Sequence, residues 1–228
     1  MTRRPAVVAF DVIETLASLE PLRARLTEIG QPPGMLETWH IRTLRDGMAL
    51  SASGDYAEFA DVAEAALRGL THYTISDEQV AAVMAGWDEL PAFPDALPAV
   101  TSLKEAGLRV ACLTNASASA GSAFVGRAGL GPAVARVISV GEVFRWKPAG
   151  LVYLYAASVM DVPADRMALV TAHDWDCHGA KKAGLTTGWV SRKSGGFGAP
   201  FTPPDVVGED LTEVVAKLLA LEPLTHPG

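Results

Sequence analysis

Five short apolar runs, each ending at a cluster of polar residues, constrain the fold of this chain more than any other feature. They are "PAVVAF", "LRVACL", "ARVISV", "MALVTA" and "TTGWV". Runs of this kind are typical of β-strands buried on both faces. Helical patterns separate them, such as "PDALPAVTSLKEAG", which ends on Gly107 as a cap, and "PAGLVYLYAASVM", which Pro148 opens. The alternation predicts an α/β fold, a Rossmann-like parallel sheet with helices on both faces.

The segment between the first two apolar runs is helical in pattern throughout. From Leu19 to Leu90 it carries stretches such as "MLETWHIRTLRDGMAL" and "DYAEFADVAEAALRGL", with no convincing buried strand. The chain then returns through the proline-rich "LPAFPDALP". We therefore expect residues 1–16 and 94–228 to form the Rossmann-like core, and residues 17–93 to form an inserted helical cap that acts as a lid.

The composition narrows the classes of partner. The 228 residues are 49% hydrophobic, enough to bury a substantial core. The net charge of −7 argues against a nucleic acid or an acidic membrane as partner, so an anionic ligand needs local cations.

Asp11 interrupts the first apolar run, which is too short for a signal peptide or a membrane span. The two cysteines fit a reducing compartment better than a disulfide scaffold. We expect a cytoplasmic protein, and leave open whether it forms a homodimer.

Polar residues follow four of the apolar runs, at the point where each run ends. Asp11 follows the first, Thr114 and Asn115 follow the second, and "HDWD" (173–176) follows the fourth. Lys147 comes after the third run and a short "GEVFRW" loop. The carboxyl ends of parallel strands share one edge of the sheet, which is where ligands bind. Asp11 alone could equally cap the next helix, but four clusters that converge on one edge favour a site.

The motifs in this order resemble those of the haloacid dehalogenase superfamily. They are Asp11 in "AFDVIETL", Thr114 and Asn115 in "CLTNAS", Lys147 in "WKP", and Asp176 in "VTAHDWDCHGA". Within the superfamily the sequence is most similar to the type II 2-haloacid dehalogenase branch, whose members have a helical cap. The resemblance covers most of the chain, including the cap, and implies a hydrolase.

Phosphatases dominate this superfamily, so phosphate hydrolysis has to be weighed. Their first motif resembles D-x-D, and its second Asp protonates the leaving alcohol; here that position is Ile13, which cannot transfer a proton. Ala172 stands where such enzymes usually place a metal-binding Asp, although Asp174 could supply a ligand by a shift in register. Phosphoryl transfer relies on a divalent cation with several oxygen ligands. The sequence therefore argues against a metal-dependent phosphatase, and we expect no metal and no cofactor.

A carboxylate without a metal or a proton donor suits a leaving group that departs as an anion, as halide does. The resemblance then implies that Asp11 displaces halide from C2 of a small anionic 2-haloacid and forms an ester. Water hydrolyses the ester at the Asp11 carbonyl, which predicts inversion at C2. The runner-up reading is a hydrolase that opens another activated carbon, such as a small-ring amino acid. A non-catalytic binding protein is opposed by the presence of Asp11, Lys147 and Asp176 together.

The resemblance also implies roles for the other residues. Lys147 is expected beside Asp11, where it stabilises charge, and Asp176 is expected to pair with Lys147 and to orient or activate water. The full catalytic set is Asp11, Thr15, Lys147, His173 and Asp176. The set expected to bind substrate or halide is Ile13, His40, Arg42, Thr114, Asn115, Tyr153 and Trp175.

Three departures from the family pattern concern the pocket. The first motif usually reads D-x-Y-G-T, and here Ile13 and Glu14 replace the aromatic residue and the glycine. His173 stands where many relatives have Asn near the water site; a neutral imidazole could accept a proton from water, or could be a buried hydrogen-bonded group. The cap arginine of relatives falls on His40. Arg42 and Arg45 lie close to His40 in the sequence, and we favour Arg42 as the replacement for that arginine. Solvated arginines on a helix surface are the alternative.

Overall fold

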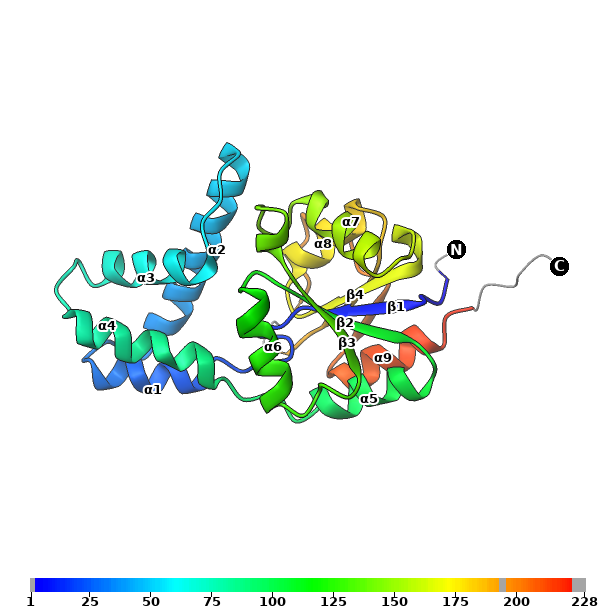
Figure 1. Cartoon of the computed structure of the whole chain (residues 1–228), viewed down its shortest axis with the longest axis horizontal. Coiled ribbons are helices and arrows are strands. Elements are labelled where there is room, and N and C mark those ends of the chain that lie inside the picture. The colour runs from blue at the N-terminus through cyan, green and yellow to red at the C-terminus, as the bar shows by residue number, and fades with distance from the viewer. Residues whose placement is uncertain (1–2, 193–195, 223–228) are drawn as a thin grey trace.

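The computed structural model describes residues 3–192 and 196–222, and a parallel sheet of six strands forms its centre (Figure 1). The strand order is β3-β2-β1-β4-β5-β6, and every pairing is parallel. The chain thus leaves β1 toward one edge and returns to build the other, which places the topological switch point beside β1. The strands are β1 (Val7–Phe10), β2 (Arg109–Thr114), β3 (Val134–Ser139), β4 (Met167–Thr171), β5 (Thr186–Val190) and β6 (Val206–Gly208).

Side chains of β1 alternate between two apolar layers, so helices cover both faces of the sheet. Val7 and Ala9 pack with α7 (Gly150–Val159) and α8 (Asp174–Lys182). Val8 and Phe10 pack on the opposite face. That layer contains α5 (Ala96–Glu105), α6 (Ala118–Arg127) and α9 (Leu211–Leu219). Two short 3-10 turns, η2 (Val140–Glu142) and η3 (Ala164–Arg166), complete the core connections. The predicted fold class is confirmed.

Details of the core differ from the sequence expectation in three places. The edge strand β3 is half exposed, at Ala135 and Arg136, because one side of it has no neighbouring strand. Helix α7 begins at Gly150, two residues after Pro148, so the proline precedes the helix and does not open it. Strand β6 was not predicted. The expected cap of α5 is confirmed, since Gly107 has φ +79°, which glycine adopts without strain.

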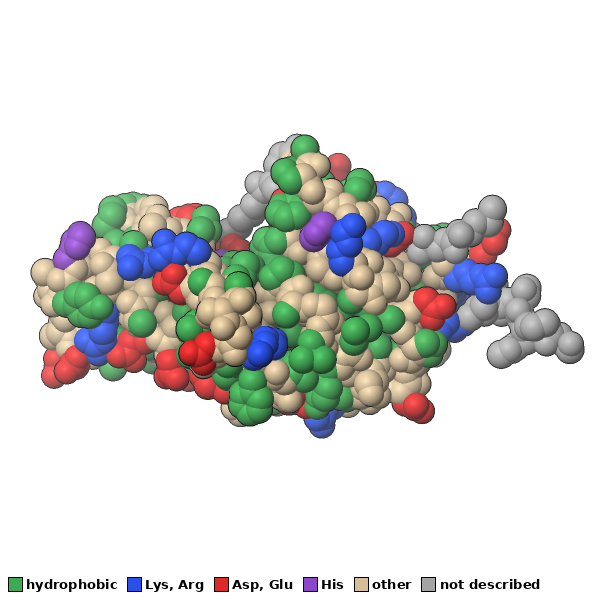
Figure 2. Space-filling view, turned by 90° about the horizontal axis from the view of Figure 1, so that it is seen from above, with side chains coloured by type: hydrophobic (Ala, Val, Ile, Leu, Met, Phe, Trp, Pro, Cys, Tyr) green, Lys and Arg blue, Asp and Glu red, His purple; other side chains and the backbone are tan. Residues whose placement is uncertain are grey.

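The segment between β1 and α5 is helical, as expected. It contains α1 (Glu20–Glu28), α2 (Met35–Ser53), α3 (Phe59–Leu70), α4 (Asp77–Met84) and the 3-10 turn η1 (Ala85–Glu89). Local signals explain two of the helix ends: a capping box between Ser76 and Gln79 begins α4, and Gly54 at φ +88° ends α2. Figure 1 shows these helices beside the sheet rather than over its faces. In Figure 2 acidic side chains gather along one edge of them.

The two chain segments that connect the inserted helices to the core lie side by side. The Ser18 backbone N–H donates to the Pro91 carbonyl at 2.9 Å, and that of Phe93 donates to Leu16 at 2.8 Å. Ala17 and Ala92 form an antiparallel bridge between these bonds. The insertion is therefore joined to the core through two adjacent chain segments that are hydrogen-bonded to each other. Among the described residues, no helix has the length and hydropathy of a membrane span.

Helix α2 also reaches the core by packing on Trp146, whose side chain is fully buried. The Trp146 backbone N–H donates to Ser51 Oγ at 2.6 Å, and its indole N–H donates to the Ala57 carbonyl at 3.0 Å. Gly47 lies directly against the indole, since a Cβ there would be 2.3 Å from ring atoms. Because Trp146 precedes Lys147, the inserted helices fix the loop that carries this lysine.

This contact predicts that Gly47→Ala destabilises the protein although alanine is the better helix former. The added methyl group must displace the buried indole, and such overpacking costs about 1–3 kcal/mol. In Gly126→Ala, a matched change in α6 with no atom within 4 Å of the new Cβ, we expect a gain of about 0.5–1 kcal/mol. Urea unfolding of both variants measures the difference. Equal effects of the two substitutions would contradict the packing described here.

Candidate active site

Asp11 follows β1 directly, and both oxygens of its buried carboxylate are held. Oδ1 accepts a hydrogen bond from Lys147 Nζ at 2.6 Å, and Oδ2 accepts one from Thr15 Oγ1 at 2.7 Å. Thr15 Oγ1 in turn accepts from the backbone N–H of Ala172 at 2.9 Å, which ties the loop after β1 to the end of β4. The side chain of Asp11 is thus fixed in one orientation at the switch point of the sheet.

Lys147 is fully buried and uses its three ammonium protons on three acceptors. Besides Asp11 these are Asp176 Oδ2 at 2.8 Å and the Leu113 carbonyl at 3.1 Å. Its backbone N–H donates to Asn115 Oδ1 at 3.1 Å. Burial alone would lower the pKa of Lys147, but the two carboxylates outweigh it and raise this pKa above its usual 10.5. The lysine therefore carries a positive charge at neutral pH.

Asp176 lies in the first turn of α8, behind the lysine as seen from Asp11. Its Oδ1 accepts from the Tyr153 hydroxyl at 2.6 Å, and its Oδ2 accepts from Lys147. Burial and the neighbouring Asp176 carboxylate raise the pKa of Tyr153 well above 10, so the phenol stays protonated and donates. The structure thus brings Tyr153 to Asp176 and not to Asp11, and both are fully buried.

His173 directly precedes α8, and its side chain faces the loop after β1. Its Nε2 lies 3.1 Å from the Ile13 carbonyl and 3.6 Å from Asp11 Oδ2. The ring stacks on Trp175, with centroids 5.0 Å apart and planes 21° apart. Since a carbonyl oxygen only accepts, the short contact with Ile13 places a proton on Nε2. His173 is consequently the imidazole that the structure brings beside the carboxylate of Asp11.

Glu14 connects the two parts of the chain at this point, a role that the sequence did not reveal. Its Oε2 lies 3.2 Å from Nδ1 of His40, a buried residue of α2, and 4.0 Å from Nε2 of His173. Glu14 has φ +62°, a conformation in which glycine is unstrained and other residues are not. The replacement of a motif glycine by Glu14 was the signal that could have indicated this contact.

Arg42 and Arg45 are not brought to this cluster. The guanidinium of Arg42 lies against Gly69 in α3, with Nε 3.8 Å from Asp46, and Arg45 pairs with the same Asp46 at 2.7 Å on the surface. Residues two positions apart on a helix point about 200° apart, so Arg42 cannot share the face that His40 turns to the core.

Arg192 is a further residue at the site that the sequence did not indicate. It follows β5, donates to the Thr15 carbonyl at 2.7 Å and pairs with Asp95 at 2.9 Å.

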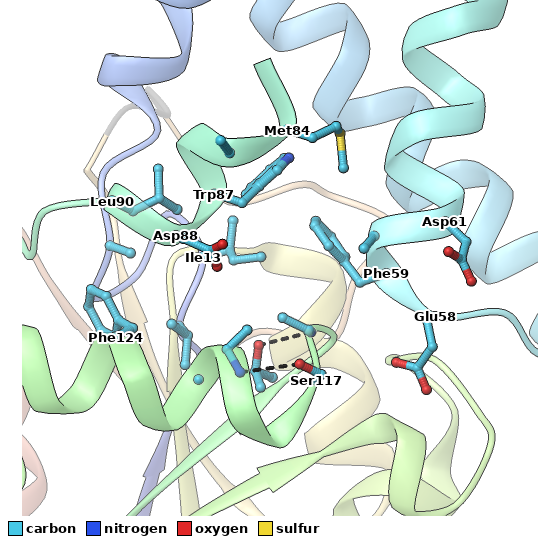
Figure 3. Close-up of a pocket in the computed structure, with 18 of the residues that line it drawn as sticks. Ile13, Glu58, Phe59, Asp61, Met84, Trp87, Asp88, Leu90, Ser117 and Phe124 are labelled. Atoms are coloured by element: carbon cyan, nitrogen blue, oxygen red, sulfur yellow. Dashed lines mark hydrogen bonds between the residues drawn. The ribbon is translucent and has the colours of Figure 1, made fainter. Parts of the chain in front are cut away.

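A cavity of about 700 Å³ adjoins the cluster, between the inserted helices and the core (Figure 3). Of the residues predicted to bind substrate, Ile13 and Thr114 line it. A second cavity of about 270 Å³ adjoins the same loop, and Leu19, Phe93 and Ala172 line it together with polar residues. These include Glu14, His173, Asp174 and Arg192.

Other reactive side chains offer no alternative centre in the described part of the chain. No three His, Cys, Asp or Glu residues there are arranged to hold a metal ion. Both cysteines are buried. Burial raises the pKa of Cys112 to about 12, and burial with the nearby Asp176 raises that of Cys177 well above 9, so neither thiol is a nucleophile at neutral pH. Asp11 is the side chain that geometry favours for attack.

Comparison with known proteins assigns the family. The model of haloacid dehalogenase-like hydrolases matches residues 6–184. The chain belongs to this family. An (S)-2-haloacid dehalogenase of Pseudomonas putida is 30% identical over 193 residues, which cover 83% of this chain and 86% of that protein. The superfamily resemblance in the motifs is thereby confirmed.

Solved structures of the haloacid dehalogenase-like hydrolases agree with this assignment. An L-2-haloacid dehalogenase superposes with a TM-score of 0.89 at 29% identity, covering 96% of this chain and all of the other. The L-2-haloacid dehalogenase of Xanthobacter autotrophicus, solved with chloropropionic acid covalently bound, has a TM-score of 0.85 at 22% identity and supports the fold. The superposition covers 95% of this chain and 99% of the Xanthobacter chain.

The contacts of Lys147 predict that Lys147→Met lowers the free energy of unfolding by about 3–5 kcal/mol at neutral pH, because Asp11 and Asp176 are left buried without their cation. The folded-state pKa of Lys147 is raised, so its contribution is complete below the usual 10.5 and is lost as pH rises through the folded-state value. Urea unfolding of both proteins at neutral and alkaline pH measures this.

The control is Lys182→Met, which changes an exposed lysine of α8 and should stay within about 0.5 kcal/mol of the wild type. A difference between wild type and Lys147→Met that grew with alkaline pH would contradict the assignment of charge.

Proposed function

We propose that this chain is a 2-haloacid dehalogenase that hydrolyses the carbon–halogen bond of small 2-haloacids of the S configuration through an ester on Asp11. The observation that carries the proposal is the carboxylate of Asp11, oriented through both oxygens by Lys147 and Thr15, with the apolar Ile13 where a phosphatase has its proton donor. The names of the similar proteins support the same chemistry.

In the first step an oxygen of Asp11 attacks C2 and the halide leaves with the bonding electrons. The leaving group needs no proton, which agrees with an aliphatic residue at position 13. In the second step water attacks Cγ of Asp11, the bond from Cγ to the ester oxygen breaks, and a 2-hydroxyacid departs with inverted configuration. One oxygen of the water then remains in Asp11. Lys147, at 2.6 Å from Oδ1, stabilises the oxyanion that forms at Cγ.

The substrate carboxylate is held, in this proposal, by uncharged donors at the end of β2. Thr114 lines the larger cavity, and Ser117 begins α6 there with its side chain accepting from the Ala120 N–H. The amino-terminal end of a helix favours negative charge. Asn115 uses its Oδ1 on Lys147, which leaves its amide N–H groups for an anion. Asp176 and Tyr153 act as positioning residues for Lys147 rather than as contacts to substrate.

His173 serves the hydrolytic step. Its Nε2 is 3.6 Å from Asp11 Oδ2, so the imidazole is close enough to contact a water that attacks Cγ. In the resting site this nitrogen donates to Ile13. Once the ester has removed the charge of Asp11, the tautomer with Nε2 unprotonated accepts a proton of the attacking water and returns it to the departing oxygen of the 2-hydroxyacid. Trp175 stacks on the ring and keeps it in place.

Residues 17–93 are proposed as the cap and residues 1–16 and 94–228 as the core. This division agrees with the hydrogen-bonded crossing at Leu16–Ser18 and Pro91–Phe93. The contact between His40 Nδ1 and Glu14 Oε2, at 3.2 Å, then joins cap to core. We also propose that the protein is cytoplasmic, on the evidence of its free thiols and acidic composition.

The proposal predicts that Asp11→Asn abolishes halide release from (S)-2-chloropropionate while the fold is retained, a loss on the order of 10⁴-fold or more. A single turnover of wild type in ¹⁸O-water, with enzyme in excess, should place the label in the Asp11 carboxylate. Peptide mass spectrometry reads the label, and the exposed Asp165→Asn serves as the control that keeps activity. Label found only in the 2-hydroxyacid would mean that water attacks the substrate directly.

His173→Gln separates the two steps. We expect a burst of one halide per active site, followed by a steady rate about 10²–10⁴-fold below wild type, because the ester forms but its hydrolysis lacks a base. Rapid-mixing measurement of halide release distinguishes the burst from the steady phase. Equal loss in both phases would place His173 in the displacement step or in the framework of the site.

A further inference from the structure

The larger cavity is apolar over most of its wall. Figure 3 shows Trp87 and Phe59 side by side in its wall, with Ile13 near Trp87 and Phe124 at the opposite end. Their rings belong to a packed aromatic group: the centroid of Phe59 lies 4.9 Å from that of Trp87 and 5.6 Å from that of Trp146. Met84 and Leu90 extend the same surface. The wall is therefore built from both the inserted helices and the core.

This cavity begins at the nucleophile's own loop. Val12 and Ile13, which directly follow Asp11, line it, and so does Thr114 at the end of the neighbouring strand. Leu113, the residue before Thr114, holds Lys147 through its carbonyl. Asp11 itself does not line the cavity, so a substrate with C2 at Asp11 reaches the apolar wall with its remaining substituent past Ile13 and Thr114.

The volume exceeds what a short haloacid needs. Cavities of about 300–1,000 Å³ enclose ligands the size of drugs, and this one measures about 700 Å³. A larger apolar substituent would remove the apolar wall from contact with water and so bind more tightly. Each methylene group buried in this way can raise the affinity by up to about fourfold.

Charge at the rim limits which substituents fit. The charged side chains that line the cavity are Glu58, Asp61 and Asp88, all of them exposed carboxylates (Figure 3). They are placed to repel a second carboxylate on the substrate. A neutral, apolar substituent meets no such repulsion, and the aromatic wall suits it.

We infer that the preferred substrate is a 2-haloacid with a medium-length alkyl chain or an aryl group on C2, and that this substituent occupies the apolar cavity. The inference rests on the proposed dehalogenase function and specifies its substrate class. The head of the substrate, with carboxylate and halogen, stays at Asp11, and the tail lies between Ile13, Phe59, Trp87 and Phe124.

The test compares kcat/KM over 2-bromopropionate, 2-bromobutanoate, 2-bromohexanoate, 2-bromo-3-phenylpropionate and 2-bromosuccinate, with bromide release as the readout. We expect kcat/KM to rise along the alkyl series by up to about fourfold per methylene, the equivalent of about 0.8 kcal/mol. The phenyl compound should rank with the longest chain, and 2-bromosuccinate should fall below 2-bromobutanoate. A flat or falling series would overturn the inference.

A pair of neighbouring variants tests the location of the tail. Ala81 on α4 lines the cavity, whereas the adjacent Ala82 does not, and both are exposed, so a larger side chain is compatible with folding at either position. Ala81→Phe should lower the ratio of kcat/KM for 2-bromohexanoate to that for 2-bromopropionate by about tenfold or more. Ala82→Phe should leave this ratio as in wild type. Equal ratios in both variants would place the tail elsewhere.

Binding of halogen-free carboxylates separates this inference from the proposed function. Acetate, butanoate and hexanoate are titrated against tryptophan fluorescence, which needs no chemistry. Affinity that rises with chain length in wild type, and less in Ala81→Phe, supports the tail site even if no haloacid releases halide, in which case the dehalogenase proposal alone fails. Affinity independent of chain length overturns the tail site even if short haloacids are hydrolysed.

Discussion

The buried ammonium group of Lys147 is the constraint on which the rest of the site depends. Moving a charge out of water costs several kcal/mol, and the cost is offset only when every proton of the group finds an acceptor. Here the acceptors come from three places in the chain: Asp11 after β1, the carbonyl of Leu113 in β2, and Asp176 in α8. The strand order is what brings these groups together, because β1 lies between β2 and β4.

The inserted helices share in holding this lysine. Trp146, one residue before it, is fully buried against Gly47 of α2 and bonds to Ser51 and Ala57. From the other side, Asn115 fixes the backbone N–H of Lys147. The loop is therefore clamped between the helical insertion and the end of β2. A displacement of α2 would be transmitted to the ammonium group and through it to Asp11, so the insertion contributes to the geometry of this carboxylate.

Much of this could be predicted from the sequence because the signals are local. Continuous apolar runs marked the five longer strands, and the polar residues at their ends follow from the parallel topology. The three residues of β6 are too short for such a signal. Charge alone favours Arg42 over His40 as the anion contact, whereas the helical repeat turns Arg42 toward Gly69 and His40 toward Glu14. Tyr153 meets Asp176 through tertiary packing, which no spacing along the chain encodes.

The loop after β1 separates two environments that the proposed reaction uses in turn. The apolar cavity reaches Val12 and Ile13, and the smaller, partly polar cavity reaches Glu14 and His173. A displacement at carbon proceeds best where water is excluded, since water would solvate the carboxylate and compete for the substrate. Hydrolysis of the ester needs one ordered water beside a base. Asp11 lies at the start of the loop, next to Val12 of the first cavity and 3.6 Å from His173 of the second, so its carboxylate is near both environments.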